Sequence, residues 1–349
     1  MGSIKRFAAI NTKIRTLEGR LLTEHDYSRL IAMNSVGDIA RYLKEHTAYT
    51  TVLEGINLSL INTDKLELLL KKYIVQQYQR LIHYFTDEYR KLFKILFTRY
   101  EIEDLKIFLR AIDREESLAN VKDMVVYSGI YSTIDYDDLS LSKNLEGLID
   151  RLRGTVYHNA LKAYTREDQE KRLFYMEMSL DRLYFKLLAE KLEKLDKRDK
   201  DILRELLGKN IDLMNLQWIY RGLKFYGLSP EELINYTLHN GHYLNFKRIK
   251  ELCYAKNEGE LIYKMIDSKY GFLFDNKDTL EIFMERRIER YLYFLLLDYK
   301  RKEKMNIIEA VVFIHLLEYE MRDIISIVEA VRYGMDEEST TKFLVRVIQ

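Results

Sequence analysis

The sequence has 349 residues, of which 47% are apolar and 32% are charged, and its formal net charge is +1. A chain of this length usually divides into two or three subdomains, and its composition excludes a disordered protein. The near-zero net charge gives no general attraction to nucleic acid, so we expect no nucleic-acid partner.

Helix-breaking residues and cysteines are scarce. Pro230 is the only proline and Cys253 the only cysteine. Few breakers favour long helices over an all-β fold, and one cysteine excludes an intramolecular disulfide and a cysteine-rich zinc site. No apolar run approaches the roughly 18 residues of a membrane-spanning helix, and basic residues interrupt the N-terminal region. We therefore expect a soluble, cytosolic all-α protein without a signal peptide.

Short helices are predicted first in the chain, followed by a long one. Thr23 and Asp26 have the spacing of a capping box, and the stretch from Gly37 to Tyr49 has the pattern of short helices. From Leu66 to Leu96, apolar residues recur at steps of three and four, which predicts one face of an amphipathic helix.

The same order of elements recurs twice. Gly147 to Tyr157 repeats the short pattern and Leu173 to Leu207 the long one. Ser229 to Glu232 is a second capping box with proline at the first helical position. A third short pattern ends at Tyr270, and a third long one runs from Leu280 to Leu317. Each copy is expected to contain two long helices that turn at a polar break.

One six-residue pattern occurs three times: apolar, acidic, apolar, any residue, Asp or Asn, aliphatic. Its fifth positions are 111 and 108 residues apart, so three units of that size account for the chain. We predict three helical repeat units, at residues 1–117, 118–229 and 230–349. The three segments are Tyr100-Glu101-Ile102-Glu103-Asp104-Leu105, Ile211-Asp212-Leu213-Met214-Asn215-Leu216 and Tyr319-Glu320-Met321-Arg322-Asp323-Ile324.

The acidic pairs in this pattern suggest acid–base chemistry or a structural role. Asn215 stands where the other copies have aspartate, and three dispersed pairs suit catalysis poorly. Carboxylates in a first helical turn would cap backbone N–H groups or form local pairs, which is the interpretation that we favour. We predict no catalytic centre in this chain.

Three other segments resemble ligand sites only weakly. The run Asp135 to Asp138 could hold magnesium, but neighbouring serines and a threonine indicate a solvated turn. His239 and His242 lack the further ligands of a zinc site, and the Asn240-Gly241 pair between them predicts a turn. Gly208-Lys209 lacks most of a phosphate loop. We expect no metal and no cofactor.

The N-terminal segment has a distinctive pattern and reads Phe7-Ala8-Ala9-Ile10-Asn11-Thr12-Lys13-Ile14-Arg15-Thr16-Leu17-Glu18-Gly19-Arg20-Leu21-Leu22. The acidic–tyrosine pair Asp26-Tyr27 follows soon after it. This pattern resembles the opening of the C-subunit family of V-type and archaeal-type ATPases, which includes the eukaryotic d subunit. The segment from Asn215 to Leu233 resembles the second copy in that family, and the segment from Glu320 to Gly334 resembles the third.

The resemblance implies an architecture and a role. In this family three helical units form a funnel with approximate threefold symmetry, on the cytoplasmic rim of the membrane rotor ring of proteolipid subunits. The funnel receives the central shaft, which is made of the D and F subunits. The chain would then be a peripheral, non-catalytic central-stalk adaptor of a rotary motor, coupling ATP synthesis or hydrolysis to H⁺ or Na⁺ transport.

Polar residues of the three repeated segments are the candidate contacts, either facing the shaft or holding the units together. An Arg-Gly-Lys sequence common in the family is Arg221-Gly222-Leu223 here and Glu329-Ala330-Val331 in the last copy, so a contact made by that lysine is absent. The candidates are Glu101, Asp104, Arg110, Asp212, Asn215, Arg221, Glu320, Arg322 and Asp323.

Two alternative functions come from other classes of protein. An α-helical scaffold would have shorter repeats, of about 34 to 47 residues, which the sequence lacks. A helical enzyme similar to terpenoid synthases would bind magnesium and a prenyl diphosphate through Asp135, Asp137 and Asp138.

Overall fold

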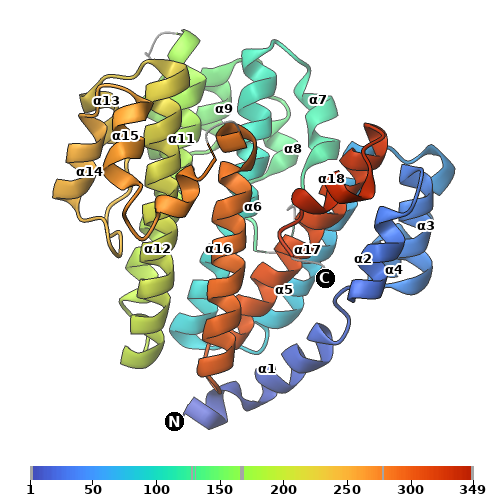
Figure 1. Cartoon of the computed structure of the whole chain (residues 1–349). Helices are drawn as coiled ribbons and strands as arrows, with labels where there is room; N and C mark the ends of the chain where they lie inside the picture. The colour runs from blue at the N-terminus through green and yellow to red at the C-terminus, as the bar shows by residue number, and fades with distance from the viewer. Residues whose placement is uncertain (1–2, 127–128, 130, 166–168, 277–278, 347–349) are drawn as a thin grey trace. The chain divides into compact units, whose positions relative to one another are not determined.

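The computed structural model of the protein describes residues 3–126, 129, 131–165, 169–276 and 279–346 (Figure 1). These residues form helices and connecting loops without any β-strand, which confirms the all-α prediction. They make two compact units, a larger one of residues 1–74 and 197–349 and a smaller one of residues 75–196. Helix α5, Thr63–Ile82, begins in the larger unit and ends in the smaller one.

Three long helices and a set of short ones make up most of the larger unit. The long ones are α12 (Lys197–Arg221), α16 (Leu280–Lys302) and α17 (Ile308–Arg332). The others are α1 (Ser3–Glu18), α2 (Glu24–Ile31), α3 (Val36–His46), α4 (Thr50–Leu53), η1 (Leu58–Leu60), η3 (a π-helix, Gly222–Tyr226), α13 (Pro230–Tyr236), α14 (Phe246–Cys253), α15 (Glu258–Met265), η4 (Gly271–Phe274) and α18 (Glu337–Lys342).

The smaller unit is built on two long helices that pack against each other, α6 (Asp87–Asp113) and α11 (Gln169–Leu192). Short helices connect them: α7 (Leu118–Val121), η2 (Lys122–Met124), α8 (Tyr136–Leu139), α9 (Leu145–Arg151) and α10 (Tyr157–Lys162).

Helix starts follow the predicted local chemistry. The hydroxyl of Thr23 accepts the N–H of Asp26, whose carboxylate accepts the N–H of Thr23, a complete capping box at α2. Ser229 and Glu232 form the same box at α13, with Pro230 at the first helical position. Both capping-box predictions are confirmed, and each box satisfies backbone donors that a helix start leaves unpaired.

The apolar pattern from Leu66 to Leu96 spans two long helices, since α5 ends at Ile82 and α6 begins at Asp87. Thr86 is extended, and Asp87 has a φ of 49°. The apolar spacing continues across the break because Phe85 remains buried. No glycine or proline marks this turn in the sequence, so the apolar period alone did not reveal it.

Each unit has a continuous apolar core that includes the helix carrying a repeated segment. In the smaller unit, Leu105 and Phe108 of α6 pack with Leu148 of α9 and Leu161 of α10, all fully buried. In the larger unit, residues of α12 pack with those of α14, α15 and α16. Each fully buried side chain of this kind stabilises the fold by roughly 1.5–3 kcal/mol. The cores therefore hold the short helices firmly against the repeated segments.

Candidate functional site

The three repeated segments lie in the middle of α6, α12 and α17, not at helix starts. The idea that their acidic residues cap a first helical turn is therefore wrong. Within each segment, positions two and five are three residues apart and lie on one helix face. The six side chains at these positions are at most 5% exposed, and each bonds to a segment distant in sequence: Glu101, Asp104, Asp212, Asn215, Glu320 and Asp323.

In the first copy, Glu101 accepts hydrogen bonds from residues between α7 and α10. The backbone N–H and the hydroxyl of Thr133 donate to its two oxygens, at 2.6 and 3.1 Å. The buried hydroxyl of Tyr157 donates to the same carboxylate. One side chain of α6 thus fixes both a loop and the start of α10.

Asp212 has the same role in the second copy. It accepts the backbone N–H groups of His242, Tyr243 and Leu244, at 3.1, 2.7 and 3.2 Å. The Tyr270 hydroxyl donates to it at 2.9 Å. A Cβ at Gly241 would clash with the Asp212 carboxylate, so the loop closes on α12 only with glycine there. The predicted turn is confirmed, with Asn240 at a φ of 70°.

Glu320 completes the set in the third copy, where its partners come from the other end of the chain. It accepts the backbone N–H of Leu22 at 2.6 Å and the hydroxyl of Tyr49 at 2.9 Å. These partners are 298 and 271 residues away in sequence. Tyr49 therefore corresponds to Tyr157 and Tyr270, the tyrosines that end the three predicted short-helix patterns.

The fifth position of each segment also has a matching role. It accepts a backbone N–H that lies 22, 23 and 22 residues further along the chain in the first, second and third copies. Asp104 accepts from Val126 at 2.9 Å, and Asp323 accepts from Val345 at 2.5 Å. A tyrosine hydroxyl also donates to each aspartate, from Tyr136 at 3.2 Å and from Tyr27 at 3.3 Å.

Both polar groups of the Asn215 side-chain amide bond to the backbone of one residue, Leu238. Its Oδ1 accepts the N–H of Leu238 at 2.7 Å, and its Nδ2 donates to the Leu238 carbonyl at 2.9 Å. An amide has a donor that a carboxylate lacks, so it bonds both polar groups of the facing backbone. The asparagine therefore preserves the contact between α12 and the segment after α13.

We name these three sets of contacts the carboxylate networks, after Glu101/Asp104, Asp212/Asn215 and Glu320/Asp323.

Burial raises the pKa of Asp212. It also raises the pKa of Glu320 to about 7 and that of Asp323 to about 6, although backbone N–H groups oppose both shifts. The third network therefore contains two carboxyls whose ionisation burial makes costly.

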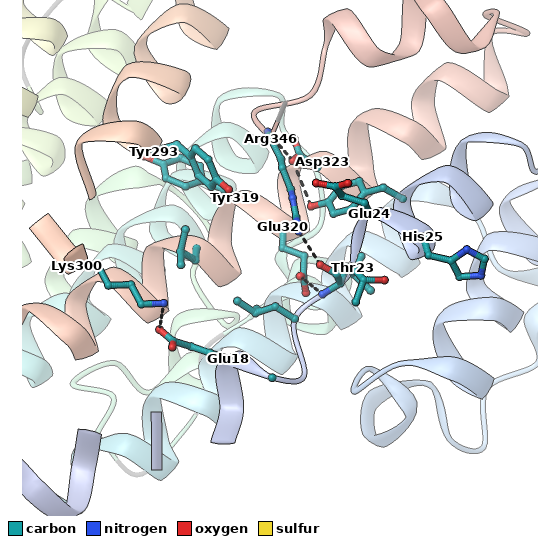
Figure 2. A pocket seen from close by; sticks show the side chains of 15 residues that line it. Glu18, Thr23, Glu24, His25, Tyr293, Lys300, Tyr319, Glu320, Asp323 and Arg346 are labelled. Atoms are coloured by element: carbon teal, nitrogen blue, oxygen red, sulfur yellow. Dashed lines mark hydrogen bonds and ion pairs between the residues drawn. The ribbon is translucent and has the colours of Figure 1, made fainter. Parts of the chain in front are cut away.

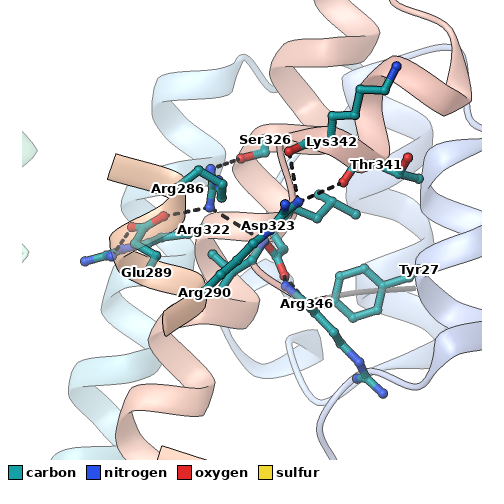
Figure 3. A network of polar contacts seen from close by, with 12 residues as sticks. Tyr27, Arg286, Glu289, Arg290, Arg322, Asp323, Ser326, Thr341, Lys342 and Arg346 are labelled. Carbon is teal, nitrogen blue, oxygen red and sulfur yellow. Dashed lines mark hydrogen bonds and ion pairs between the residues drawn. The ribbon is translucent and has the colours of Figure 1, made fainter. Parts of the chain in front are cut away.

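Arginines surround the Asp323 end of the third network (Figure 3). Arg286 lies 3.9 Å from Asp323, bonds to Glu289 at 2.8 Å and donates to the Ser326 hydroxyl at 3.0 Å. Arg290 donates to the carbonyl oxygens of Leu344 and Lys342, both at 2.9 Å. The segment after α18 is thereby attached to both α16 and α17.

A hollow of about 610 Å³ lies beside the third network, within the larger unit (Figure 2). Residues of the α1–α2 connection, α16 and α17 line it, together with Arg346. At one end Lys300 pairs with Glu18 at 2.8 Å. Arg346 donates to the Leu22 carbonyl at 2.7 Å and lies over the Tyr27 ring.

The three arginines among the predicted contacts have different surroundings. Arg110 is exposed and forms a two-bond pair with Glu177, at 2.6 and 2.9 Å. Arg322 is half-buried and pairs with Glu289. Arg221 is exposed at the end of α12.

The weaker ligand-site candidates have structural partners. Asp135 caps α8, Asp137 pairs with Lys122, and Asp138 pairs with Arg151. The loop from His239 to His242 supplies a donor to Asp212. No group of three metal-binding side chains occurs among the described residues.

Comparison with known proteins identifies the family. The family model described as ATP synthase (C/AC39) subunit matches residues 10–343. The chain belongs to this family. That membership makes it a subunit of a V/A-type ATPase, in agreement with the resemblance found in the sequence.

Archaeal relatives, each named as the C subunit of an A-type ATP synthase, are similar over most of the chain. The protein of Methanococcoides burtonii is 26% identical over 72% of this chain and 68% of its own length. That of Methanosarcina mazei is 22% identical over 73% and 69%. That of Methanocaldococcus jannaschii is 27% identical over 71% of this chain, which spans 62% of that relative. Within the described part of this family member, no helix has the length and apolarity needed to cross a membrane.

Proposed function

We propose that this chain is the central-stalk adaptor of a rotary ATPase, a non-catalytic socket between the D–F shaft and the proteolipid ring. It would lie on the cytoplasmic side of the membrane and transmit rotation between ATP turnover and H⁺ or Na⁺ movement. Membership in the ATP synthase (C/AC39) subunit family supports this assignment.

The order of the carboxylate networks is the observation that carries the proposal. These contacts can be assigned to the three predicted repeat units, whose boundaries lie at residues 118 and 230. Glu101 of the first repeat unit bonds to Tyr157 of the second. Asp212 of the second bonds to Tyr270 of the third. Glu320 of the third bonds to Tyr49 of the first. The proposed units are thus linked in cyclic order, as expected of a funnel with approximate threefold symmetry.

This arrangement suits an element that transmits torque. Buried charged or polar hydrogen bonds in a low-dielectric interior resist rearrangement, since breaking one leaves an unsatisfied group. Three of them in cyclic order would oppose twisting of one unit against the next. The six buried network residues would then serve between units, and the exposed arginines would be the candidates for shaft contact.

Arg221 provides the sharpest test of shaft contact. It is exposed at the end of a long helix and forms no ion pair among the described residues. Arg29, exposed on α2, is a matched control. We expect the purified chain to form a 1:1:1 complex with the D and F proteins in size-exclusion chromatography with light scattering. We expect R221E to weaken that complex and R29E to leave it unchanged.

Two results would count against the proposal in different ways. Absence of binding by the folded wild-type chain, to the shaft and to ring-containing membranes alike, would refute the adaptor role. Normal binding by R221E would remove Arg221 from the shaft contact while leaving the adaptor role in place.

A further inference from the structure

The carboxylate networks place three stretches of sequence in equivalent positions, each ending at a network tyrosine. We name these stretches the outer layers: residues 126–157, 239–270 and 18–49. Matching hydrogen bonds hold Thr133 and Tyr157, Leu244 and Tyr270, and Leu22 and Tyr49. Exposed side chains elsewhere on these stretches take no part in those bonds, so the networks do not require the differences between them.

Exposed aromatic rings are concentrated on the second outer layer. Tyr243, Phe246, Tyr254 and Tyr263 are 40%, 52%, 49% and 81% exposed. In the described parts of the other two outer layers, no aromatic side chain is comparably exposed. Single exposed apolar residues are ordinary, but aromatic residues are enriched in the buried centres of protein interfaces.

Three residues of this surface belong to α14 and its end. Phe246 and Lys250 are four residues apart and lie on one face of α14, and Tyr254 is the residue that caps its C-terminal end. The Nζ of Lys250 lies 6.0 Å from the centre of the Tyr254 ring. Helix α15 packs beside α14, where Arg248 donates to the Lys264 carbonyl at 2.8 Å.

The second outer layer also has the opposite charge to the other two. It has six basic and four acidic residues, whereas the first has three and five and the third has four and five. Two of its basic residues pair internally, Arg248 with Glu251 and Lys264 with Glu260. The other four form no ion pair with the described residues: Lys247, Lys250, Lys256 and Lys269.

We infer that the outer surface of α14 and α15 docks an acidic segment of another protein, one with apolar residues beside its carboxylates. Lysines would pair with its acidic residues while the four aromatic side chains cover its apolar ones. An excess of two positive charges holds a lipid surface weakly, at about 1 kcal/mol per basic residue. Tyrosine and phenylalanine are enriched in the buried centres of protein interfaces, so the partner that we infer is a protein.

This inference rests on the proposed function, since the partner would be another component of the rotary ATPase. A symmetric body that meets a single-copy partner needs one face that differs from the others. The second outer layer is that face by both criteria, exposed aromatic rings and charge.

Site-specific photo-crosslinking in the assembled ATPase tests the inference. A photoreactive residue would replace Phe246 or Tyr263, and the control would replace Leu141, which is 66% exposed on the first outer layer. We expect the first two to form adducts with an acidic segment of another protein of the complex and the control to form none. Adducts to lipid or nucleic acid, no adduct from either test position, or equal adducts from Leu141 would overturn it.

Charge reversal provides the second readout. We expect K247E/K250E to lower the adduct yield at Tyr263 by at least tenfold, and lysines placed at the partner's acidic positions to restore it. K143E, on the first outer layer, is the control. An assembled complex with an unchanged yield would refute the docking surface alone, whereas a wild-type chain absent from the complex would refute the proposed function as well.

Discussion

Replacing Asp212 with alanine tests whether one carboxylate holds the 242–244 loop on α12. Leu244 and Tyr270 are buried, so the N–H of the first and the hydroxyl of the second would lose their acceptor without gaining water. Each unsatisfied buried group costs about 1–3 kcal/mol. The N–H of His242 also donates to the Gly208 carbonyl at 3.2 Å, and Tyr243 is exposed to water, so these two N–H groups would lose Asp212 at small cost.

Two opposing contributions set the expected size of the effect. The two buried donors together would cost roughly 4 kcal/mol. Burial raises the pKa of Asp212, so removing the carboxylate also relieves part of the cost of burying its charge. We expect D212A to lower the free energy of unfolding by roughly 2–4 kcal/mol at neutral pH.

Urea denaturation followed by tryptophan fluorescence measures this effect where it arises. Trp218 is the only tryptophan and lies in α12 of the larger unit, so its signal reports on the unit that contains Asp212. D201A removes an exposed carboxylate from the same helix and should change stability by less than about 0.5 kcal/mol. A loss below about 1 kcal/mol in D212A, or an equal loss in D201A, would refute the reasoning.

Three further predictions concern single side chains. Because the folded pKa of Glu320 is about 7 and its ordinary value 4.5, its contribution to stability is full below pH 4.5 and is lost as the pH rises through 7. The stability of wild type relative to E320Q should thus fall by roughly 3 kcal/mol between pH 4.5 and 8 in urea titrations, and a constant difference would contradict this. Glu115 has a φ of 57° where Gly334 in the third copy has 65°, so E115G should stabilise the protein by about 0.5–1 kcal/mol and G334A destabilise it similarly, as thermal unfolding would show. N215D would place a buried carboxylate against the Leu238 carbonyl and should cost about 2–3 kcal/mol in urea denaturation, whereas an unchanged midpoint would argue against the two-way contact.

Local signals predicted much of the helical order. Capping boxes at Thr23 and Ser229 act within four residues, so the sequence contains all the information they need. The repeated acidic pattern located the six network positions. Sequence alone did not show the donors for those positions, since they lie 22 to 58 residues away, or across most of the chain in the third copy.

Tyr27 and Tyr136 illustrate what the sequence could not reveal. Both donate to the aspartate of a network. Both also lie close to a helix cap, Tyr27 four residues after Thr23 and Tyr136 directly after Asp135. With 27 tyrosines in the chain, their hydroxyls had no distinguishing local signature. The position of the break before Asp87 was not predicted either, because the buried Phe85 preserves the apolar period through the turn.

Leu22 and Tyr49 both donate to Glu320, so the first fifty residues of the sequence depend on an acceptor that is made much later. Their acceptor lies 298 and 271 residues further along the chain, so the third network forms only after α17 has been made. Until then Leu22 and Tyr49 lack their acceptor, whereas Thr133 and Tyr157 find Glu101 as soon as they follow it in the growing chain. The N-terminal helices therefore wait longer for their network acceptor during synthesis than Thr133 and Tyr157 do.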